Sequence, residues 1–304
     1  NKVLMDKKLL WAHLALLGAN IIYGLNYSIA KIVMPDYIAP FGFIFCRVLG
    51  ALTLFWLFFS FGKREKIAPK DYLLFFVCGM FGVAGNQLMF FYGLNLTSPI
   101  NAAIIMTCNP ILVLIMSAII IRERITPVKI GGIFLGLAGA AGLILHGNKL
   151  SVGTDTFWGD LFIFLNATSY AFYLVLVKPL MKKYSPTTVI KWVFLFGFMI
   201  VFPFGFNQFN QVDWSSFDSG IWSAFLFVVV GTTFLAYLFN IIGLKQLNPS
   251  VVSSYIYSQP LIATLFALIL GQDELTFVKL ISAVFIFAGV YLVSIRKAKP
   301  KVNH

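Results

Sequence analysis

Charged residues are scarce in this chain of 304 residues: Asp, Glu, Lys and Arg make up 11%, whereas apolar residues make up 60%. A soluble domain carries about 25% charged residues, because its folded core needs a polar surface. The shortage excludes a soluble enzyme, a secreted disulfide scaffold and a disordered regulator. The apolar runs are continuous over roughly the 20 residues that a membrane-crossing helix needs, which also excludes a transmembrane β-barrel. The sequence therefore predicts an all-α membrane protein.

Residues that bind metals or perform catalysis are also few. The three cysteines, Cys46, Cys78 and Cys108, lie inside apolar runs at no pairing or metal-binding spacing. The sequence has no glycine-lysine signature of an ATP-binding loop, no zinc-type His and Cys spacing, and no pair of Asp residues inside the apolar runs. We therefore expect no catalytic residue, no metal and no cofactor, and a membrane enzyme is disfavoured.

Polar or proline-containing breaks divide the sequence into ten apolar runs, which predict ten transmembrane helices. They lie at residues 10–32, 41–61, 71–92, 100–121, 128–146, 158–177, 189–207, 219–243, 250–271 and 278–295. Nineteen of the 23 Lys and Arg residues fall in segments on the same side as the N-terminal segment. Because such residues concentrate in cytoplasmic segments, both termini are expected in the cytoplasm, with the protein integral to the cell (cytoplasmic, or inner) membrane. These clusters account for the net charge of +12 without nucleic acid as a partner.

The sequence contains an internal repeat. Residues 93–143 align without a gap with residues 243–293, and the matches include Pro99 with Pro249 and Pro110 with Pro260. At an offset of 147 residues, Tyr23 aligns with Tyr170. Five predicted helices in each half is an odd number, so the two halves are expected to be inverted relative to each other. Inverted repeats are typical of secondary transporters, which alternate access to a site at the repeat interface.

The motifs of both halves resemble those of the drug/metabolite transporter superfamily, in the EamA-domain family with ten transmembrane helices. The residues that carry the resemblance are Pro40, Phe45-Cys46-Arg47-Val48-Leu49, Tyr92-Gly93-Leu94, Asn109-Pro110, Arg122-Glu123-Arg124-Ile125-Thr126, Gln259-Pro260 and Gly271-Gln272-Asp273-Glu274-Leu275-Thr276. The last motif departs from the usual Gly-Glu pair by the insertion of Gln272 and Asp273. The resemblance implies two EamA-like five-helix repeats, at 10–145 and 158–296. It also implies export or exchange of small metabolites, often amino acids.

Two amide residues before prolines mark a candidate substrate site. Asn109-Pro110 and Gln259-Pro260 lie near the middle of the fourth and ninth predicted helices. Each proline lacks an N–H, which leaves a helical carbonyl without its donor and predicts a kink. Proline-interrupted helices at matching repeat positions indicate a transporter site. The alternative is a kink satisfied by neighbouring Ser or Thr side chains.

Helical spacing extends the candidate substrate-binding set beyond these two amides. Asn101 and Asn109 share one predicted face, as do Tyr255 and Gln259. The full set is Asn20, Tyr23, Arg47, Gln87, Asn109, Tyr170, Tyr237, Tyr255 and Gln259. A cavity walled by Tyr, Asn and Gln suits a small zwitterion or heterocycle. For each residue, ordinary hydrogen bonding between helices is the alternative, and Arg47 could instead snorkel to the outer interface.

These observations predict a secondary transporter of a small polar metabolite, most plausibly an amino acid or derivative, working by alternating access. The acids fall in loops or at helix ends, with Asp160 the one ambiguous case. Facilitated diffusion or exchange is therefore expected in place of ion coupling. The alternatives are an exchanger of phosphorylated or nucleotide-linked metabolites, or a channel. Gly132 and Gly136 are expected to pack within the chain, which favours a monomer in the lipid bilayer over a dimer.

Overall fold

The computed structural model describes residues 2–59, 65–121, 126–146, 155–247, 252 and 255–294. Every regular element in these ranges is a helix, as the composition predicted. Of the motifs singled out above, residues 122–125 and the proline at 249 lie outside the described residues.

The helices of the first half follow the predicted runs closely. They are α1 (Lys2–Val33), α2 (Pro40–Phe59), η1 (Pro69–Asp71), α3 (Tyr72–Gly79), η2 (Met80–Ala84), α4 (Gly85–Leu96), α5 (Pro99–Met106), α6 (Asn109–Ile121) and α7 (Pro127–His146). Those of the second half are α8 (Asp155–Leu176), α9 (Lys178–Lys183), α10 (Pro186–Asn210), η3 (Trp214–Ser216), α11 (Ser219–Leu226), η4 (Phe227–Leu235), α12 (Ala236–Gln246), η5 (Tyr255–Ser258), α14 (Gln259–Ile269) and α15 (Phe277–Ser294).

Seven helical stretches are long and apolar enough to cross a membrane, and three further apolar helices are shorter. The seven are Leu9–Val33, Pro40–Phe59, Pro69–Leu96, Pro99–Ile120, Asp155–Lys183, Pro186–Asn210 and Ser219–Gln246, and the three are Pro127–Gly142, Tyr255–Ile269 and Phe277–Gly289. All ten overlap the predicted runs. The protein is therefore a multi-pass membrane protein, and the count of ten crossings stays a prediction.

Several predicted helices are interrupted, and each interruption has a local cause. Between α5 and α6 the amides of Thr107 and Cys108 bond to carbonyls three residues earlier, at Ile104 and Ile105. The break comes just before Pro110, which has no N–H to continue the α-helical ladder. The π-helical turns η2 and η4 interrupt the two matching helices, one in each half.

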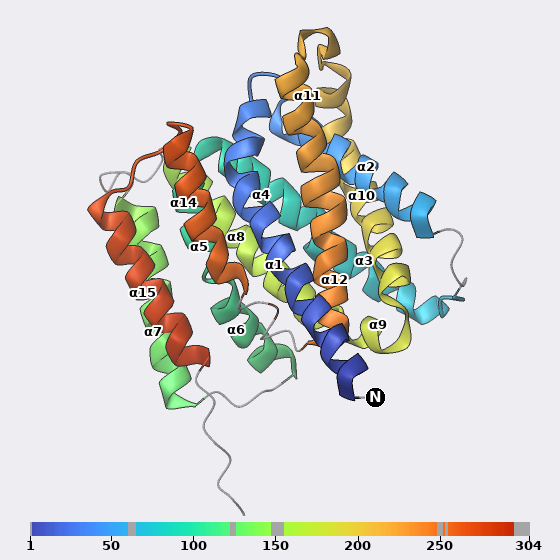
Figure 1. Cartoon of the computed structure of the whole chain (residues 1–304), viewed down its shortest axis with the longest axis horizontal. Coiled ribbons are helices and arrows are strands. Elements are labelled where there is room, and N and C mark those ends of the chain that lie inside the picture. The colour runs from blue at the N-terminus through green and yellow to red at the C-terminus, as the bar shows by residue number, and fades with distance from the viewer. Residues whose placement is uncertain are drawn as a thin grey trace, which may run out of the picture.

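The helices pack in pairs around a central group. Figure 1 shows α7 and α15 side by side at one edge, α2 next to α10, and α1 in the middle between α14 and α12. In the α7–α15 pair a Cβ added to Gly289 meets the amide nitrogen of Gly136, and one added to Gly139 meets the carbonyl of Ser282 at 2.9 Å. The glycines therefore bring these two helices together within the chain, as the sequence predicted.

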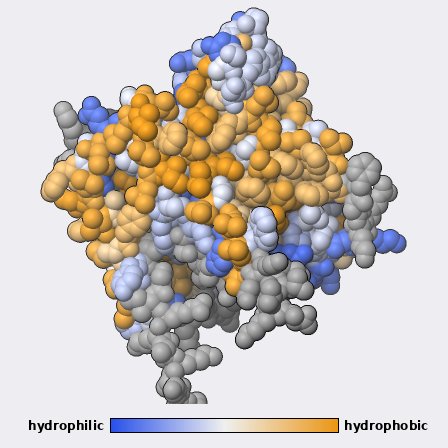
Figure 2. All heavy atoms as spheres, viewed as in Figure 1, coloured by the Kyte–Doolittle hydropathy of each residue, from blue (hydrophilic) through white to orange (hydrophobic). Residues whose placement is uncertain are grey.

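The outer surface of the bundle is strongly apolar. Figure 2 shows hydrophobic residues over most of one face, and side chains such as Phe134, Leu261 and Phe277 are more than 70% exposed. A soluble monomer rarely exposes a large contiguous apolar patch. This surface suits contact with lipid.

Candidate functional site

A cavity in the central group of helices collects most of the predicted site residues. Its walls come from α1, α2, α4, α5, α8, η4, α12, η5 and α14. Seven of the nine predicted substrate-binding residues line it: Asn20, Tyr23, Arg47, Gln87, Tyr170, Tyr237 and Gln259. The structure therefore brings these seven side chains together around one cavity, and their role in substrate binding stays a prediction.

Gln259 forms part of the cavity wall through two side-chain hydrogen bonds to α1. Its amide nitrogen donates to Asn20 Oδ1 at 2.6 Å, and its amide oxygen accepts from the Tyr27 hydroxyl at 3.0 Å. Asn20 in turn donates to the Leu16 carbonyl at 2.8 Å. Pro260 occupies the first turn of α14, where its missing N–H costs least. The network fixes the orientation of three polar side chains at the cavity.

The structure places Asn109 and Tyr255 outside the cavity lining. Asn109 is fully buried and donates to the carbonyl of Ala167 on α8 at 2.9 Å, so its side chain ties α6 to α8. The Tyr255 hydroxyl lies 2.5 Å from Nδ1 of His13, near the start of the apolar part of α1. Asn109 follows a 3₁₀-type turn and Tyr255 is the first residue of the 3₁₀-helix η5, and such turns change the helical phase on which the predicted positions depended.

Arg47 brings a positive charge into the cavity. The side chain is 2% exposed, which differs from the alternative of snorkelling. Its Nε donates to Thr233 Oγ1 at 2.9 Å, and the guanidinium lies 3.9 Å from the centre of the Phe91 ring. Among the described residues no carboxylate forms an ion pair with it, and its Nη1 is buried without a hydrogen-bond partner. A buried guanidinium in this position attracts an anionic group.

Tyrosine and amide side chains surround the rest of the cavity. The Tyr237 hydroxyl lies 3.4 Å from both the Gly82 carbonyl and Asn86 Oδ1, and 3.5 Å from the amide nitrogen of Gln87. Asn240 donates to the Tyr23 hydroxyl at 3.2 Å. These contacts join α4, α12 and α1 across the cavity.

Several polar atoms in the lining are buried without a hydrogen-bond partner among the residues that the structure describes. They are Oδ1 of Asn26, Nη1 of Arg47, Oε1 of Gln87, Oδ1 of Asn166 and Oγ1 of Thr232. Leaving a buried donor or acceptor unsatisfied costs about 1–3 kcal/mol, and native proteins satisfy nearly all such groups. The set offers one guanidinium donor and three amide acceptors to a solute in the cavity.

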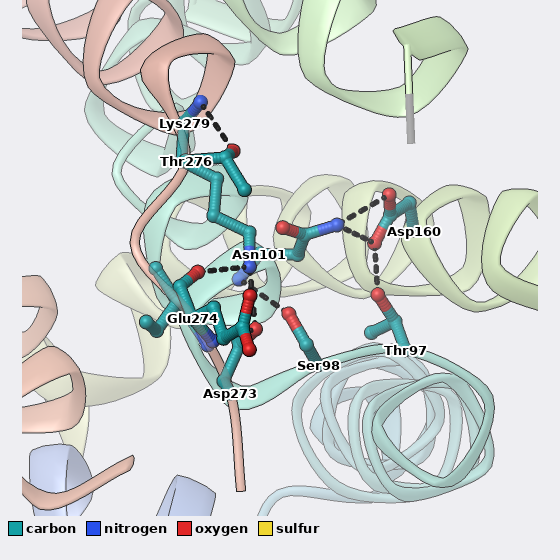
Figure 3. A network of polar contacts seen from close by, with 9 residues as sticks. Thr97, Ser98, Asn101, Asp160, Asp273, Glu274, Thr276 and Lys279 are labelled. Atoms are coloured by element: carbon teal, nitrogen blue, oxygen red, sulfur yellow. Dashed lines mark hydrogen bonds and ion pairs between the residues drawn. The ribbon is translucent and has the colours of Figure 1, made fainter. Parts of the chain in front are cut away.

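A second polar cluster joins the start of α8, the α4–α5 connection and the segment between α14 and α15 (Figure 3). The segment between α14 and α15 lies at the end of the bundle opposite the start of α1 (Figure 1), and we call this end the distal end. Asp160 on α8 is fully buried, accepts a hydrogen bond from the Thr97 hydroxyl and accepts from the amide of Asn101 at 3.1 Å. Beside Asn101, Lys279 and Asp273 form an ion pair of 2.5 Å. Asp160 thus lies inside α8, whereas the sequence left open whether it was at a helix end.

Two glycines, Gly93 and Gly159, let the backbones of α4 and α8 come into contact next to Asp160. A Cβ added to Gly159 meets the Gly93 carbonyl oxygen and the Thr97 amide nitrogen, each at 2.8 Å. Helices α4 and α8 therefore touch backbone to backbone at the distal end.

The comparison with known families identifies the chain. The family model described as the EamA-like transporter family matches residues 10–145 and 157–295. The chain belongs to the EamA-like transporter family.

The relatives of this EamA-like transporter include several whose names contain the word transporter. "Uncharacterized transporter YyaM" of Bacillus subtilis (strain 168) is 28% identical over 294 residues, which cover 96% of each chain. An "Uncharacterized transporter" of Archaeoglobus fulgidus is 25% identical over 287 residues, 94% of this chain and 98% of the relative. A "WAT1-related protein At3g53210" of Arabidopsis thaliana is 25% identical over 306 residues, covering 91% and 80%.

A solved crystal structure shares the fold of this EamA-like transporter. It aligns with 93% of this chain and 96% of its own at a TM-score of 0.64, with 18% sequence identity. At this identity the likeness concerns the fold alone.

Sequence reasoning missed several lining residues of the transporter, including Asn26, Asn86 and Thr232. Asn26 lies three residues after Tyr23, so the helical spacing that selected Tyr23 could also have found it. Asn86 lies two residues after the π-helical turn η2, and Thr232 lies within the π-helical turn η4. The wider turn shifts the helical phase, and no residue pattern in the sequence marked it.

Proposed function

We propose that this EamA-like transporter moves a small polar metabolite, most plausibly an amino acid or derivative, outward across the cytoplasmic membrane by alternating access. The observation that carries the proposal is the buried Arg47 guanidinium, which forms no ion pair among the described residues and whose Nη1 has no hydrogen-bond partner there, in a cavity where the oxygens of Asn26, Gln87 and Asn166 also lack partners. An acidic group on the substrate satisfies Arg47, and an amino group satisfies the amide oxygens. A zwitterion supplies both groups in one small molecule.

The position of the donors and acceptors supports this reading. Guanidinium binds a carboxylate through paired hydrogen bonds, and Arg47 keeps Nη1 free of other partners. Gln87 and Asn166 present unpartnered oxygens from α4 and α8, and such oxygens accept from an ammonium group. Apolar lining from Phe90 and Met106 is available to a substrate side chain.

We further propose ten transmembrane helices arranged as two inverted five-helix repeats, at 10–145 and 158–296, with both termini in the cytoplasm. The ten apolar helical stretches support this arrangement. The interruptions of the α-helix just before Pro110 and Pro260, at matching positions of the two halves, also support it. The distribution of Lys and Arg supports the orientation. In this orientation the distal end faces outward.

We also propose that the substrate itself drives the cycle, through facilitated diffusion or exchange. Among the described lining residues none is Asp, Glu or His, the side chains that usually bind a coupling proton within the membrane. In this proposal, therefore, transport of the substrate is not coupled to the movement of a proton.

The test begins with the purified transporter and a panel of amino acids, sugar phosphates and nucleotide conjugates, screened by thermal shift and then by counterflow in proteoliposomes. We expect an amino acid or derivative to give saturable counterflow. Arg47→Met removes a charge-assisted bond worth about 1.5–3 kcal/mol, so substrate affinity is expected to fall about 10- to 100-fold. Arg47→Lys keeps the charge and should lose less.

Other outcomes would replace the proposal. Success of a sugar phosphate with failure of every amino acid would favour an exchanger of phosphorylated metabolites. Flux that rises linearly with concentration, without acceleration by unlabelled substrate on the far side, would indicate a channel. Concentrative uptake that collapses with an ionophore would contradict facilitated diffusion and exchange.

A further inference from the structure

The Arg47 guanidinium leaves one positive charge unbalanced in the cavity. None of the described lining residues is Asp or Glu, and the Phe91 ring at 3.9 Å offsets only part of the cost of taking a charge out of water. A buried carboxylate can lose its charge by binding a proton, but a guanidinium in a protein stays protonated. The cavity therefore favours an anion whether or not a substrate is present.

Tyrosine side chains surround the same charge. Tyr23 and Tyr237 lie close enough to Arg47 to interact with it electrostatically, and their rings meet edge-on with centroids 6.4 Å apart. Tyr170 interacts in the same way with both tyrosines. The three tyrosines come from α1, α8 and α12, and all of them line the cavity. Because a tyrosine hydroxyl can donate a hydrogen bond, this group suits an anion held next to the guanidinium.

Two hydroxyls of the lining have a proton free to donate. The Tyr23 hydroxyl accepts from Asn240 at 3.2 Å and donates to no group among the described residues. The Thr232 hydroxyl, which follows directly on the π-helical turn before the Thr233 that bonds Arg47, has no partner there either. The cavity volume is about 90 Å³, several times what one water molecule needs. The lining thus provides both donors and room for a small ion.

We infer that the cavity binds a small monovalent inorganic anion, of the size and charge of chloride, at Arg47 when no substrate is present. The guanidinium and the Tyr23 hydroxyl donate to the ion, and its single charge balances that of Arg47. A doubly charged phosphate would leave an excess negative charge in the same cavity. Water molecules satisfy the donors but carry no charge, so they balance the guanidinium less well.

The ion and the proposed substrate share Arg47. A substrate carboxylate and chloride cannot occupy the guanidinium together, so chloride should compete with the substrate. This competition rests on the proposed function, whereas the ion site itself does not and can be tested without a substrate.

Two measurements on the purified full-length transporter, made without an organic substrate, test the ion site. They are equilibrium binding of radiolabelled chloride, and thermal unfolding as chloride replaces methanesulfonate, a larger monovalent anion, at constant pH and ionic strength. We expect saturable chloride binding. At about ten times its dissociation constant, chloride should raise the melting temperature by about 2–5 °C, because a ligand of the folded state stabilises it. Arg47→Met should abolish both effects.

Lys191→Met is the matched control, because Lys191 is also a cation over an aromatic ring, 4.6 Å from the centre of the Trp56 ring, but does not line the cavity. It should leave chloride binding unchanged. If Arg47→Met does not fold, Tyr23→Phe tests the same site, since loss of one donor to a charged ligand should weaken chloride binding about tenfold. Absence of saturable chloride binding, or full affinity in either Arg47→Met or Tyr23→Phe, would overturn the inference.

A third measurement separates the ion site from the proposed function. An amino acid that the transporter accepts should displace the chloride, and chloride at about ten times its dissociation constant should weaken the apparent affinity for that amino acid about tenfold. Chloride that binds at Arg47 but is displaced by no amino acid would confirm the ion site and contradict the proposed substrate. An amino acid that binds to a transporter without affinity for chloride would do the reverse.

Discussion

The two proline-interrupted helices use matching amide residues in different ways. Gln259 reaches the side chain of Asn20 on α1 and lines the cavity, whereas Asn109 reaches the backbone carbonyl of Ala167 on α8 and is enclosed. Asn20 and Ala167 are themselves separated by 147 residues, the offset at which Tyr23 aligns with Tyr170. The same pair of positions thus makes both contacts. A repeat can preserve a backbone break and a contact between helices while only one of its two copies keeps the side chain on the cavity wall.

Among the changes that test this comparison, the largest loss of transport is expected from Gln259→Ala. Asn20 and Tyr27 lose the bonds that hold them in position at the proposed site, each worth about 1 kcal/mol, so ordering them again on substrate binding should lower affinity by up to about 30-fold. Counterflow in proteoliposomes with the substrate found by the panel measures this. Unchanged affinity in a folded variant would remove Gln259 from the substrate site.

The helix interruptions before Pro110 and Pro260 should contribute equally to the rate of transport. Pro110→Ala and Pro260→Ala each restore an N–H, which can bond to the carbonyl of Met106 or Ile256 and continue the helix. We expect both variants to slow counterflow severalfold, with substrate binding in thermal-shift titrations preserved. A loss in one variant alone would show that the two breaks have diverged as the side chains have.

Asn109→Ala should affect stability far more than transport. It removes one hydrogen bond between α6 and α8, worth about 0.5–1.5 kcal/mol, and leaves a buried gap at a fully buried position, while the Ala167 carbonyl keeps its bond within α8. The melting temperature should fall, whereas the dissociation constant of the substrate should stay the same. Weaker substrate binding at an unchanged melting temperature would instead indicate that Asn109 contacts the substrate, as the sequence predicted.

The smallest effect is expected from Tyr255→Phe. The hydroxyl bonds to His13 away from the cavity lining, so its loss should cost about 0.5–1.5 kcal/mol of stability. Counterflow should match that of the unmodified transporter. A clear drop in transport would mean that the His13–Tyr255 contact takes part in the cycle.

Periodicity in the sequence predicted the helices and much of the cavity, because continuous α-helix keeps a fixed phase. Asn20 and Tyr23 lie on the uninterrupted α1 and point where spacing placed them. The prediction was lost where the phase changes. Four residues of 3₁₀-helix, as between Tyr255 and Gln259, turn about 480°, whereas four residues of α-helix turn about 400°. The two side chains therefore separate.

Burial of Asp160 could not be read from the sequence for a different reason. Its position near the start of α8 depends on neighbours that are distant in the chain, Thr97 and Asn101, and on the glycine that lets α4 approach. The hydropathy of the sequence indicates where along its own helix an acidic residue lies. It does not indicate which residues from other helices bury that acid. The family resemblance likewise described the architecture and left this residue without a role.

The glycine contact between α4 and α8 makes the spacing of these two helices sensitive to a single substitution. A methyl group at position 159 meets the backbone of Gly93 and Thr97, and no rotamer change can move a backbone aside. We therefore expect Gly159→Ala to increase the distance between α4 and α8 at this point. In the alternating-access cycle proposed above, this substitution should favour the conformation in which the distal end is open, for use in crystallisation or in raising a conformation-selective binder, without changing a residue of the cavity lining.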